Sequence, residues 1–242
     1  MLARRSGQIP EEWVADDRAP EALLPITVDS ARDGADWLDG VLSIAHLDRQ
    51  AGQPVFVEVW CEAEGLGPRL ARQAGKFGVP VYPAGGFVGL KPKRVAAHRV
   101  AEREMPTVAL QVGDYDKHGR WAFSAQAEDI AAWAPKDAQP RGRWQYRSGA
   151  ESLVLEDPTG RTRLTVVRLA VTERQVADGL VEVDEDGKAE ADQVPVRELD
   201  RIVTEALREW LPNESARSGA FAAEMTLRDD VRRLLAGRWT TR

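Results

Sequence analysis

The 242-residue chain has little of several residue types, and each shortage excludes a class of protein. It has one cysteine, Cys61, so an intramolecular disulfide is excluded, and a Cys/His zinc site is not expected because there are only three scattered histidines, at positions 46, 98 and 118. No apolar run approaches the roughly 18 residues that a membrane-spanning helix needs, and no apolar segment follows the N-terminal arginines. We therefore expect a soluble, cytoplasmic protein.

Acidic residues are absent from residues 65–101, although Asp and Glu outnumber Lys and Arg in the chain by 39 to 33. The net charge of −6 alone argues against a nucleic-acid ligand, but the seven Lys and Arg of this stretch make it strongly basic. Cations clustered in this way favour contacts with a phosphate backbone, and such contacts weaken as salt rises. The candidate side chains are Lys91, Lys93 and Arg94, with Lys117 further along the chain.

Two apolar segments end in acidic residues. Residues 54–62 read PVFVEVWCE and residues 106–119 read PTVALQVGDYDKHG. Runs of this kind predict buried strands, and the carboxyl ends of parallel strands meet at one edge of a sheet. Carboxylate oxygens are the protein ligands that Mg²⁺ prefers. The sequence therefore predicts a site for Mg²⁺, with Mn²⁺ as a substitute, at this edge, with Glu62, Asp114 and Asp116 as ligands.

Helical and strand patterns alternate along the chain. Helices are expected over residues 29–50, 66–77 and 93–104 and from 125 onward, with strands over 54–62, 79–82 and 106–112. This order predicts an α/β fold: a mostly parallel sheet with helices on both faces. Residues 152–169 predict a β-hairpin insertion that turns at residues 158–160 and continues into the last strand.

The C-terminal third is predicted to be largely helical. Residues 181–193 are rich in acids and amides, so we expect a flexible, exposed loop there. A helix over 198–211 and an amphipathic helix over 227–235 follow. Near the start of the first of these helices, Glu198 and Asp200 are acids of the kind that serve as ordinary helix-start charges.

The order of the acids resembles the Toprim domain. In that family a Glu ends the first strand and an Asp-x-Asp-x-x-Gly motif follows a later one, as Glu62 and residues 114–119 do here. The resemblance covers roughly residues 50–210. It implies a Rossmann-like sheet and an Mg²⁺ site that handles nucleic-acid phosphodiesters, as in topoisomerases, primases and several nucleases.

A second, more specific resemblance involves segments other than these acidic residues. Residues 79–87, VPVYPAGGF, resemble the strand and glycine-rich turn of the branch that contains the topoisomerase VI A subunit. Residues 4–16 resemble the segment that closes a winged-helix region in uncharacterised Toprim proteins of actinobacteria, phages and mobile elements. In those relatives a Glu-Leu-Asp like residues 198–200 lies near the metal face, so the resemblance makes Glu198 or Asp200 a candidate fourth acid of the metal site. We accordingly expect an N-terminal lead and helix over 1–50, left after a winged helix, then a Toprim-like domain over 51–211 and a helical tail over 212–242.

The resemblance implies two mechanisms. In the topoisomerase VI branch a winged-helix tyrosine attacks DNA, whereas the tyrosines here, Tyr82, Tyr115 and Tyr146, all lie outside the N-terminal lead. Metal-assisted hydrolysis needs no tyrosine. In that mechanism Glu64 is a candidate second-metal ligand or general base, and Lys117 or His118 is a candidate for neutralising phosphate or moving a proton. Because relatives differ at positions 63, 117 and 118, the acid/base residue stays open.

Alternatives remain at the level of the sequence. A DxD motif also occurs in haloacid-dehalogenase phosphatases and nucleotide-sugar transferases, but in the phosphatases it ends the first strand, whereas here a complete strand precedes it. We expect an Mg²⁺-dependent enzyme acting on DNA phosphodiesters, either a nuclease or the cleavage component of a topoisomerase-like machine. The alternative is a non-catalytic module that binds nucleic acid or a protein. DNA is the expected partner, and a winged-helix or tyrosine-bearing protein and a second copy of the chain are further candidates.

Overall fold

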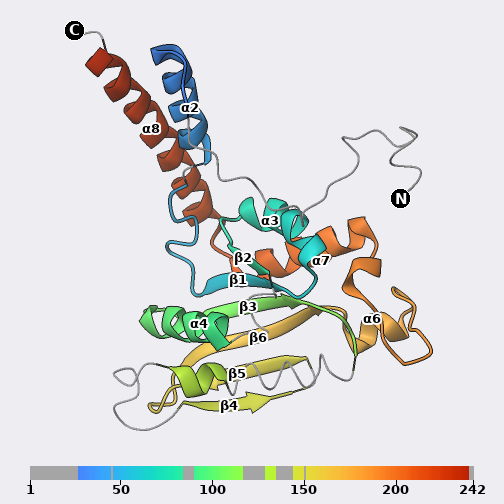
Figure 1. The fold of residues 1–242 in the computed structure, drawn as a ribbon. Coiled ribbons are helices and arrows are strands. Elements are labelled where there is room, and N and C mark those ends of the chain that lie inside the picture. The colour runs from blue at the N-terminus through green and yellow to red at the C-terminus, as the bar shows by residue number, and fades with distance from the viewer. Residues whose placement is uncertain are drawn as a thin grey trace, which may run out of the picture. The chain divides into compact units, whose positions relative to one another are not determined.

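The computed structural model describes residues 27–44, 46–83, 90–116, 129–134, 144–149 and 151–239 (Figure 1). The chain forms two compact units, residues 1–44 and 45–242. The described part of the first unit is helix α2 (Ala31–Ile44) and the residues just before it. Ser30 caps this helix, because its Oγ accepts a hydrogen bond from the Asp33 N–H at 3.1 Å. The expected helix over 29–50 is therefore present but shorter.

The second unit contains a six-stranded sheet in the order β2-β1-β3-β6-β5-β4 (Figure 1). Strands β1 (Phe56–Cys61), β2 (Val81–Pro83), β3 (Thr107–Val112) and β6 (Thr162–Ala170) pair in parallel. Strands β5 (Ser152–Glu156) and β4 (Gln145–Ser148) extend the sheet by antiparallel pairing. The predicted α/β class is confirmed, and the sheet is a mixed one whose parallel part is confined to four strands.

The predicted turn at residues 158–160 is confirmed. Asp157 Oδ1 accepts hydrogen bonds from the N–H groups of Thr159 and Arg161, and Gly160 has a φ of +81°, which glycine adopts without strain. Strand β6 runs without a break from this turn to the carboxyl edge of the sheet. The hairpin is thus an extension of the sheet by two strands, which is why the sheet is mixed.

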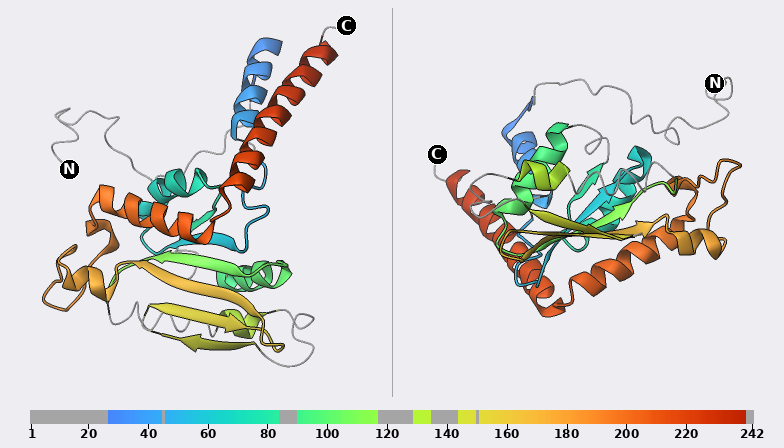
Figure 2. Two further views of the ribbon diagram at one scale, coloured as in Figure 1. Left: turned by 180° about the vertical axis from the view of Figure 1, so that it is seen from behind. Right: turned by 90° about the horizontal axis from the view of Figure 1, so that it is seen from below.

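Side chains alternate between the two faces of the sheet because successive strand residues point in opposite directions. One face packs against α3 (Gly67–Gly75) and α7 (Val196–Trp210), which follow a 3-10 turn at Glu64–Leu66 and another at Ala191–Gln193. The other face packs against α4 (Leu90–Glu102) and the helical residues 129–133. Helices on both faces are therefore confirmed, and Figure 2 shows α7 and α4 on opposite sides of the sheet.

A fully buried carboxylate lies on the α4 face, in the middle of β1. Glu58 has no exposed surface and accepts hydrogen bonds from Arg99 Nε (2.6 Å), Arg103 Nη1 (2.6 Å) and Trp60 Nε1 (2.8 Å). The Arg99 guanidinium stacks on the Tyr82 ring at 4.0 Å from its centroid. The charge of Glu58 is thus compensated inside the protein, as a buried carboxylate requires.

Helix α8 (Glu214–Trp239) is much longer than the predicted 227–235 helix. Among its described side chains only Glu224 is buried. Its carboxylate lies 3.0 Å from His46 Nδ1, 2.8 Å from Arg49 Nη2 and 2.7 Å from Arg228 Nη2. This cluster fastens the helix to residues 46–49. No helix in the described ranges is long and apolar enough to cross a membrane.

Most of the loop predicted over 181–193 is exposed, as expected, but the loop is anchored in the core near its two ends. Val181, Ala189, Ala191 and Val194 are buried in the core of the α7 face. Short helix α6 (Glu173–Ala177), capped by Thr172, leads into this segment. These small apolar residues enter the core while the acids between them stay exposed, so the composition predicted the exposure of the loop but not its buried anchor residues.

Candidate metal centre

The predicted acids lie at the carboxyl edge of the parallel strands. In the β1–β3 ladder Cys61 pairs with Val112, so Glu62 and Gly113 come next on adjacent strands. The Glu62 N–H donates to the Val112 carbonyl at 2.8 Å, and the Gly113 N–H donates to the Ala170 carbonyl of β6 at 2.6 Å. The ends of three strands are therefore tied together where the sequence predicted the site.

Gly113 lets the Glu62 side chain lie directly over the backbone of the next strand. A Cβ atom at position 113 would stand 2.3 Å from Glu62 Oε2. The Asp114 N–H also donates a hydrogen bond to the Glu62 carboxylate. Glycine at this position thus leaves room for a carboxylate against the turn that carries Asp114 and Asp116.

The three carboxylates act on one another electrostatically. Glu62 is exposed at the end of its strand, yet partial desolvation of its carboxyl group raises its pKa and repulsion from Asp114 and Asp116 raises it further, while Arg168 and the Asp114 N–H oppose these effects. Like charges that share a site disfavour ionisation. Glu62 is therefore a carboxylate whose negative charge would be relieved by an added cation.

The segment predicted to be flexible closes over the DxD turn. Tyr115 and Ala189 exchange two backbone hydrogen bonds, of 2.8 and 2.9 Å, and Asp114 Oδ1 accepts the Ala191 N–H at 2.8 Å. One oxygen of Asp114 is thus used to hold the turn against residues 189–191.

Lys188 is a site residue that the sequence analysis missed. Its ammonium donates to the Glu190 carboxylate at 2.7 Å, and this bond, together with the charges of Asp114 and Asp116, raises the pKa of Lys188. The segment brings one cation to the DxD motif. A signal existed, since Lys188 is the one Lys or Arg between residues 175 and 196.

Arg168 is the second residue that the analysis missed. It lies on β6, is 5% exposed, and donates through Nη1 to the carbonyls of Asp114 (3.0 Å) and Val171 (3.1 Å). Burial lowers its pKa, and the charges of Glu62, Glu151, Asp116 and Asp114 act in the opposite direction. A buried arginine inside an apolar strand is unusual, and that was the available signal.

The chemistry of this donor set fits a hard divalent cation, because it consists of carboxylate oxygens with excess negative charge. Within the described ranges, however, no three His, Cys, Asp or Glu side chains lie close enough together to hold a metal ion as they stand. An ion at this edge would have to draw the side chains of Glu62, Asp114 and Asp116 toward it.

The remaining predicted residues fare differently. Lys117 and His118 lie outside the described residues. Glu64 begins a 3-10 turn just after Glu62, and Lys91 lies in the first turn of α4. Lys93 forms an ion pair with Asp129, so its charge is locally compensated.

Arg94 is exposed beside a groove of about 480 Å³ on α4. Val95, His98, Arg99 and Glu102 also line this groove.

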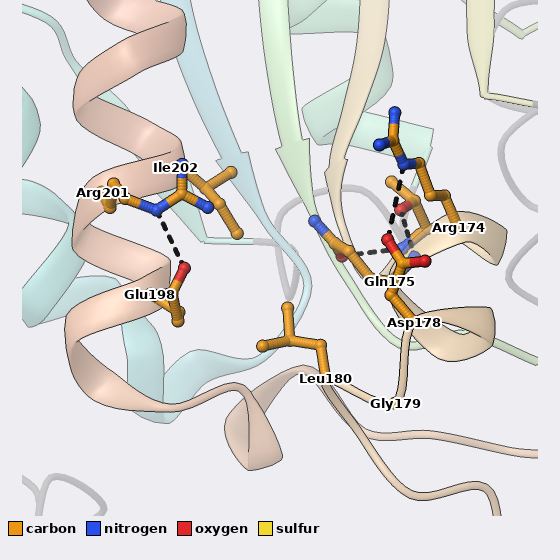
Figure 3. Close-up of a pocket in the computed structure, with 9 residues that line it drawn as sticks. Arg174, Gln175, Asp178, Gly179, Leu180, Glu198, Arg201 and Ile202 are labelled. Atoms are coloured by element: carbon orange, nitrogen blue, oxygen red, sulfur yellow. Dashed lines mark hydrogen bonds and ion pairs between the residues drawn. The ribbon is translucent and has the colours of Figure 1, made fainter.

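Each candidate fourth acid is paired with an arginine. Asp200 forms an ion pair with Arg69 at 3.0 Å, and the hydrogen bond from Arg69 lowers the pKa of Asp200. Glu198 pairs with Arg201 at 2.9 Å and lines a pocket of about 510 Å³ between α6 and α7. Figure 3 shows this pocket, with Arg174 and Asp178 paired on its other wall. The geometry therefore favours the interpretation that both acids are ordinary charges at the start of a helix.

Cys61 is a buried strand residue, as predicted. Its Sγ donates to the Ala63 carbonyl at 2.9 Å, and burial raises the pKa of the thiol to about 11. Glu62 and Asp114 raise it as well. The thiol is therefore protonated at neutral pH and is a poor nucleophile.

Comparison with protein-family models, with curated proteins and with solved structures gave no match to this chain. The assignment to the Toprim family therefore stays a prediction that rests on the motif residues.

Proposed function

We propose that the chain is a divalent-metal-dependent protein that acts on DNA phosphodiesters, with Glu62, Asp114 and Asp116 as the metal-binding acids. The observation that carries the proposal is the placement of these acids at the carboxyl edge of adjacent parallel strands, where Gly113 leaves room for the Glu62 carboxylate beside the DxD turn. Acids held together without enough countercharge favour a bound cation. Crevices at this edge of α/β sheets are also where ligands bind.

Each side chain has a proposed role. Bound at this edge, Mg²⁺ or Mn²⁺ would polarise a phosphoryl oxygen and lower the pKa of a bound water. Lys188 would neutralise phosphate, since its ammonium is already within the field of Asp114 and Asp116. Arg94, exposed on α4, would contact the nucleic-acid backbone further from the reaction, together with Lys91. Glu64, Lys117 and His118 stay candidates for proton transfer.

A second candidate function is a Toprim module that binds nucleic acid or a protein without catalysis. It is favoured by one observation, that no three acids of the described ranges are arranged as a ligand set. The same edge would then bind a partner through its charge rather than through a metal.

Cleavage of supercoiled plasmid separates these functions. We expect nicking or linearisation in Mg²⁺ or Mn²⁺ that is lost in EDTA and in the Asp114→Asn/Asp116→Asn variant. Asp229→Asn, which changes an exposed acid of α8, is the matched control and should retain cleavage. Salt-sensitive DNA binding without cleavage in any metal would instead support the binding module.

A further inference from the structure

The pocket between α6 and α7 has no part in the proposed metal chemistry. It lies near the carboxyl end of β6, because α6 begins just after that strand ends at Ala170. Its volume of about 510 Å³ falls within the roughly 300–1,000 Å³ that is typical of ligand pockets. Ligands of α/β sheets commonly bind at the carboxyl ends of the strands. The pocket is therefore a candidate binding site in its own right.

Two exposed ion pairs form the walls of this pocket (Figure 3). On α6 Arg174 pairs with Asp178 at 3.4 Å, and these side chains are 89% and 67% exposed. On α7 Arg201 lies 2.9 Å from Glu198 and 2.6 Å from Glu205, so one cation faces two carboxylates. Ion pairs as exposed as these contribute little to stability. A charged group of a ligand can therefore replace either arginine at small cost.

The space between the two walls is partly apolar. Leu180 and Ile202 line it, and both side chains are only partly buried. Figure 3 shows the Leu180 side chain between the walls. Because removing such apolar surface from water is favourable, an apolar group of a ligand would gain free energy here. The pocket thus suits a ligand that carries both charged and apolar groups.

The surface around the pocket has an excess of negative charge. Residues 173–205, here called the acidic lobe, contain eleven Asp and Glu and four Lys and Arg, a net charge of −7. Arg69 of α3 neutralises one of these acids, Asp200. Residues 182–186 are all exposed, and four of the five are acids. The acidic lobe therefore attracts a cationic partner and repels nucleic acid.

We propose that the pocket between α6 and α7 binds a basic peptide segment of a protein partner, in which arginine or lysine alternates with large apolar residues. The cations would pair with Asp178 and Glu198, and an apolar side chain would pack on Leu180 and Ile202. A small amine would leave most of the acidic lobe uncovered, whereas a peptide chain can also reach residues 182–186. The inference goes beyond the proposed metal-dependent function and does not rest on it.

The test is fluorescence anisotropy of a fluorescein-labelled peptide of alternating leucine and arginine, titrated with the full-length chain in EDTA. We expect binding that weakens as salt rises, because salt screens exposed charges. A glycine–arginine peptide of the same length and charge should bind about tenfold more weakly, since it has no side chain for the apolar part of the pocket. A leucine–glutamate peptide should not bind.

Two double variants locate the binding site. Asp178→Asn/Glu198→Gln removes one acid from each wall and should weaken binding of the leucine–arginine peptide about tenfold. Asp229→Asn/Asp230→Asn removes the same charge from exposed acids of α8 and should leave the affinity unchanged.

Three results would overturn the inference: no binding of the leucine–arginine peptide, equal binding of the glycine–arginine peptide, or equal weakening by the two double variants. The first two are measured on the wild type, so the test holds even where a variant fails to fold. A wild-type dimer in analytical ultracentrifugation that only Asp178→Asn/Glu198→Gln disrupts would also overturn it, because the pocket would then bind a second copy of the chain.

Discussion

Strand β1 carries two glutamates, Glu58 and Glu62, in opposite electrostatic situations. Burial alone would raise the pKa of Glu58, but hydrogen bonds and charges from Arg99 and Arg103, with a bond from Trp60, bring it below its usual value. The pKa of Glu62 is raised by partial desolvation and by Asp114, and among the described residues Arg168 is the cation that lowers it. One carboxylate has its countercharges inside the fold, while the other lacks them.

This is the difference expected between an acid that stabilises the fold, such as Glu58, and an acid that binds a ligand, as proposed for Glu62. Glu58 lies in the middle of the strand, under the arginines of α4, where nothing further needs to bind. Glu62 lies at the strand end, where Gly113 and the DxD turn gather more acids around it. We therefore infer that the shifted pKa of Glu58, in the middle of β1, reflects packing of the fold, and that the shifted pKa of Glu62, at its end, reflects a binding site.

The largest expected effect on stability comes from removing the negative charge of Glu58. Glu58→Gln leaves two partly buried guanidiniums without their anion, so the free energy of unfolding should fall by about 3 kcal/mol. Urea unfolding measures it. Asp178→Asn, at an exposed ion pair with Arg174, should change it by less than about 0.5 kcal/mol. Equal effects of the two changes would remove the distinction drawn for Glu58.

Lowering the pH should reveal the contribution of Glu224 to stability, because its carboxylate is also compensated by nearby cations. The hydrogen bond from Arg49 is the main cause that lowers the pKa of Glu224 from 4.5 to about 2. Because the folded-state pKa lies below that of the unfolded chain, this stabilisation is complete above about pH 4.5 and is lost as the pH falls toward 2. The difference in unfolding free energy between wild type and Glu224→Gln should shrink over that range. A difference that stays constant down to pH 2 would contradict the ion cluster.

Lys188 should affect activity without affecting stability. Its ion pair with Glu190 is exposed, so Lys188→Gln should leave the unfolding free energy nearly unchanged. Loss of a cation beside the reacting phosphate should lower plasmid cleavage by about tenfold or more. Arg201→Gln, at an exposed arginine of α7, is the control. Wild-type cleavage rates in Lys188→Gln would remove Lys188 from the site.

Gly113→Ala should have a modest effect on stability and a distinct effect on metal binding. In Gly113→Ala the new Cβ meets the mobile end of the Glu62 side chain, which can turn away at a cost of about 1 kcal/mol or less. Metal affinity should nevertheless fall, because the carboxylate no longer lies against the DxD turn. In a Glu62→Ala background the same change should have no effect on metal affinity, and a double-mutant cycle measures that coupling. An additive cycle would show that Gly113 and Glu62 act independently.

Much of the fold followed from local patterns. The apolar strands, the helices between them and the turn at Asp157 to Gly160 are each specified by nearby residues, so they could be predicted. The length of α8 could not, because a mostly exposed helix lacks the apolar periodicity on which the prediction depends. The exposure of residues 181–193 was predicted, but the burial of Val181, Ala189 and Ala191 was missed because these residues pack against parts of the core that are far away in the sequence.

Only those residues of the candidate site that belong to a recognisable sequence motif could be predicted. Glu62, Asp114 and Asp116 follow strands directly, so parallel pairing brings them to one edge. Arg168 and Lys188 reach that edge through β6 and through the Tyr115–Ala189 bridge, which are tertiary contacts that no local pattern reports. The countercharges were therefore harder to predict than the acids.

The most direct test of the contrast between Glu58 and Glu62 is the free energy of unfolding with and without Mg²⁺. Without metal, Glu62→Gln should be at least as stable as the wild type, because it relieves repulsion among the acids. Saturating Mg²⁺, near 100 times its dissociation constant, should stabilise the wild type by about 2.7 kcal/mol and leave Glu62→Gln unchanged. A wild type that does not respond to Mg²⁺, beside a destabilised Glu62→Gln, would show that Glu62 is a structural acid like Glu58.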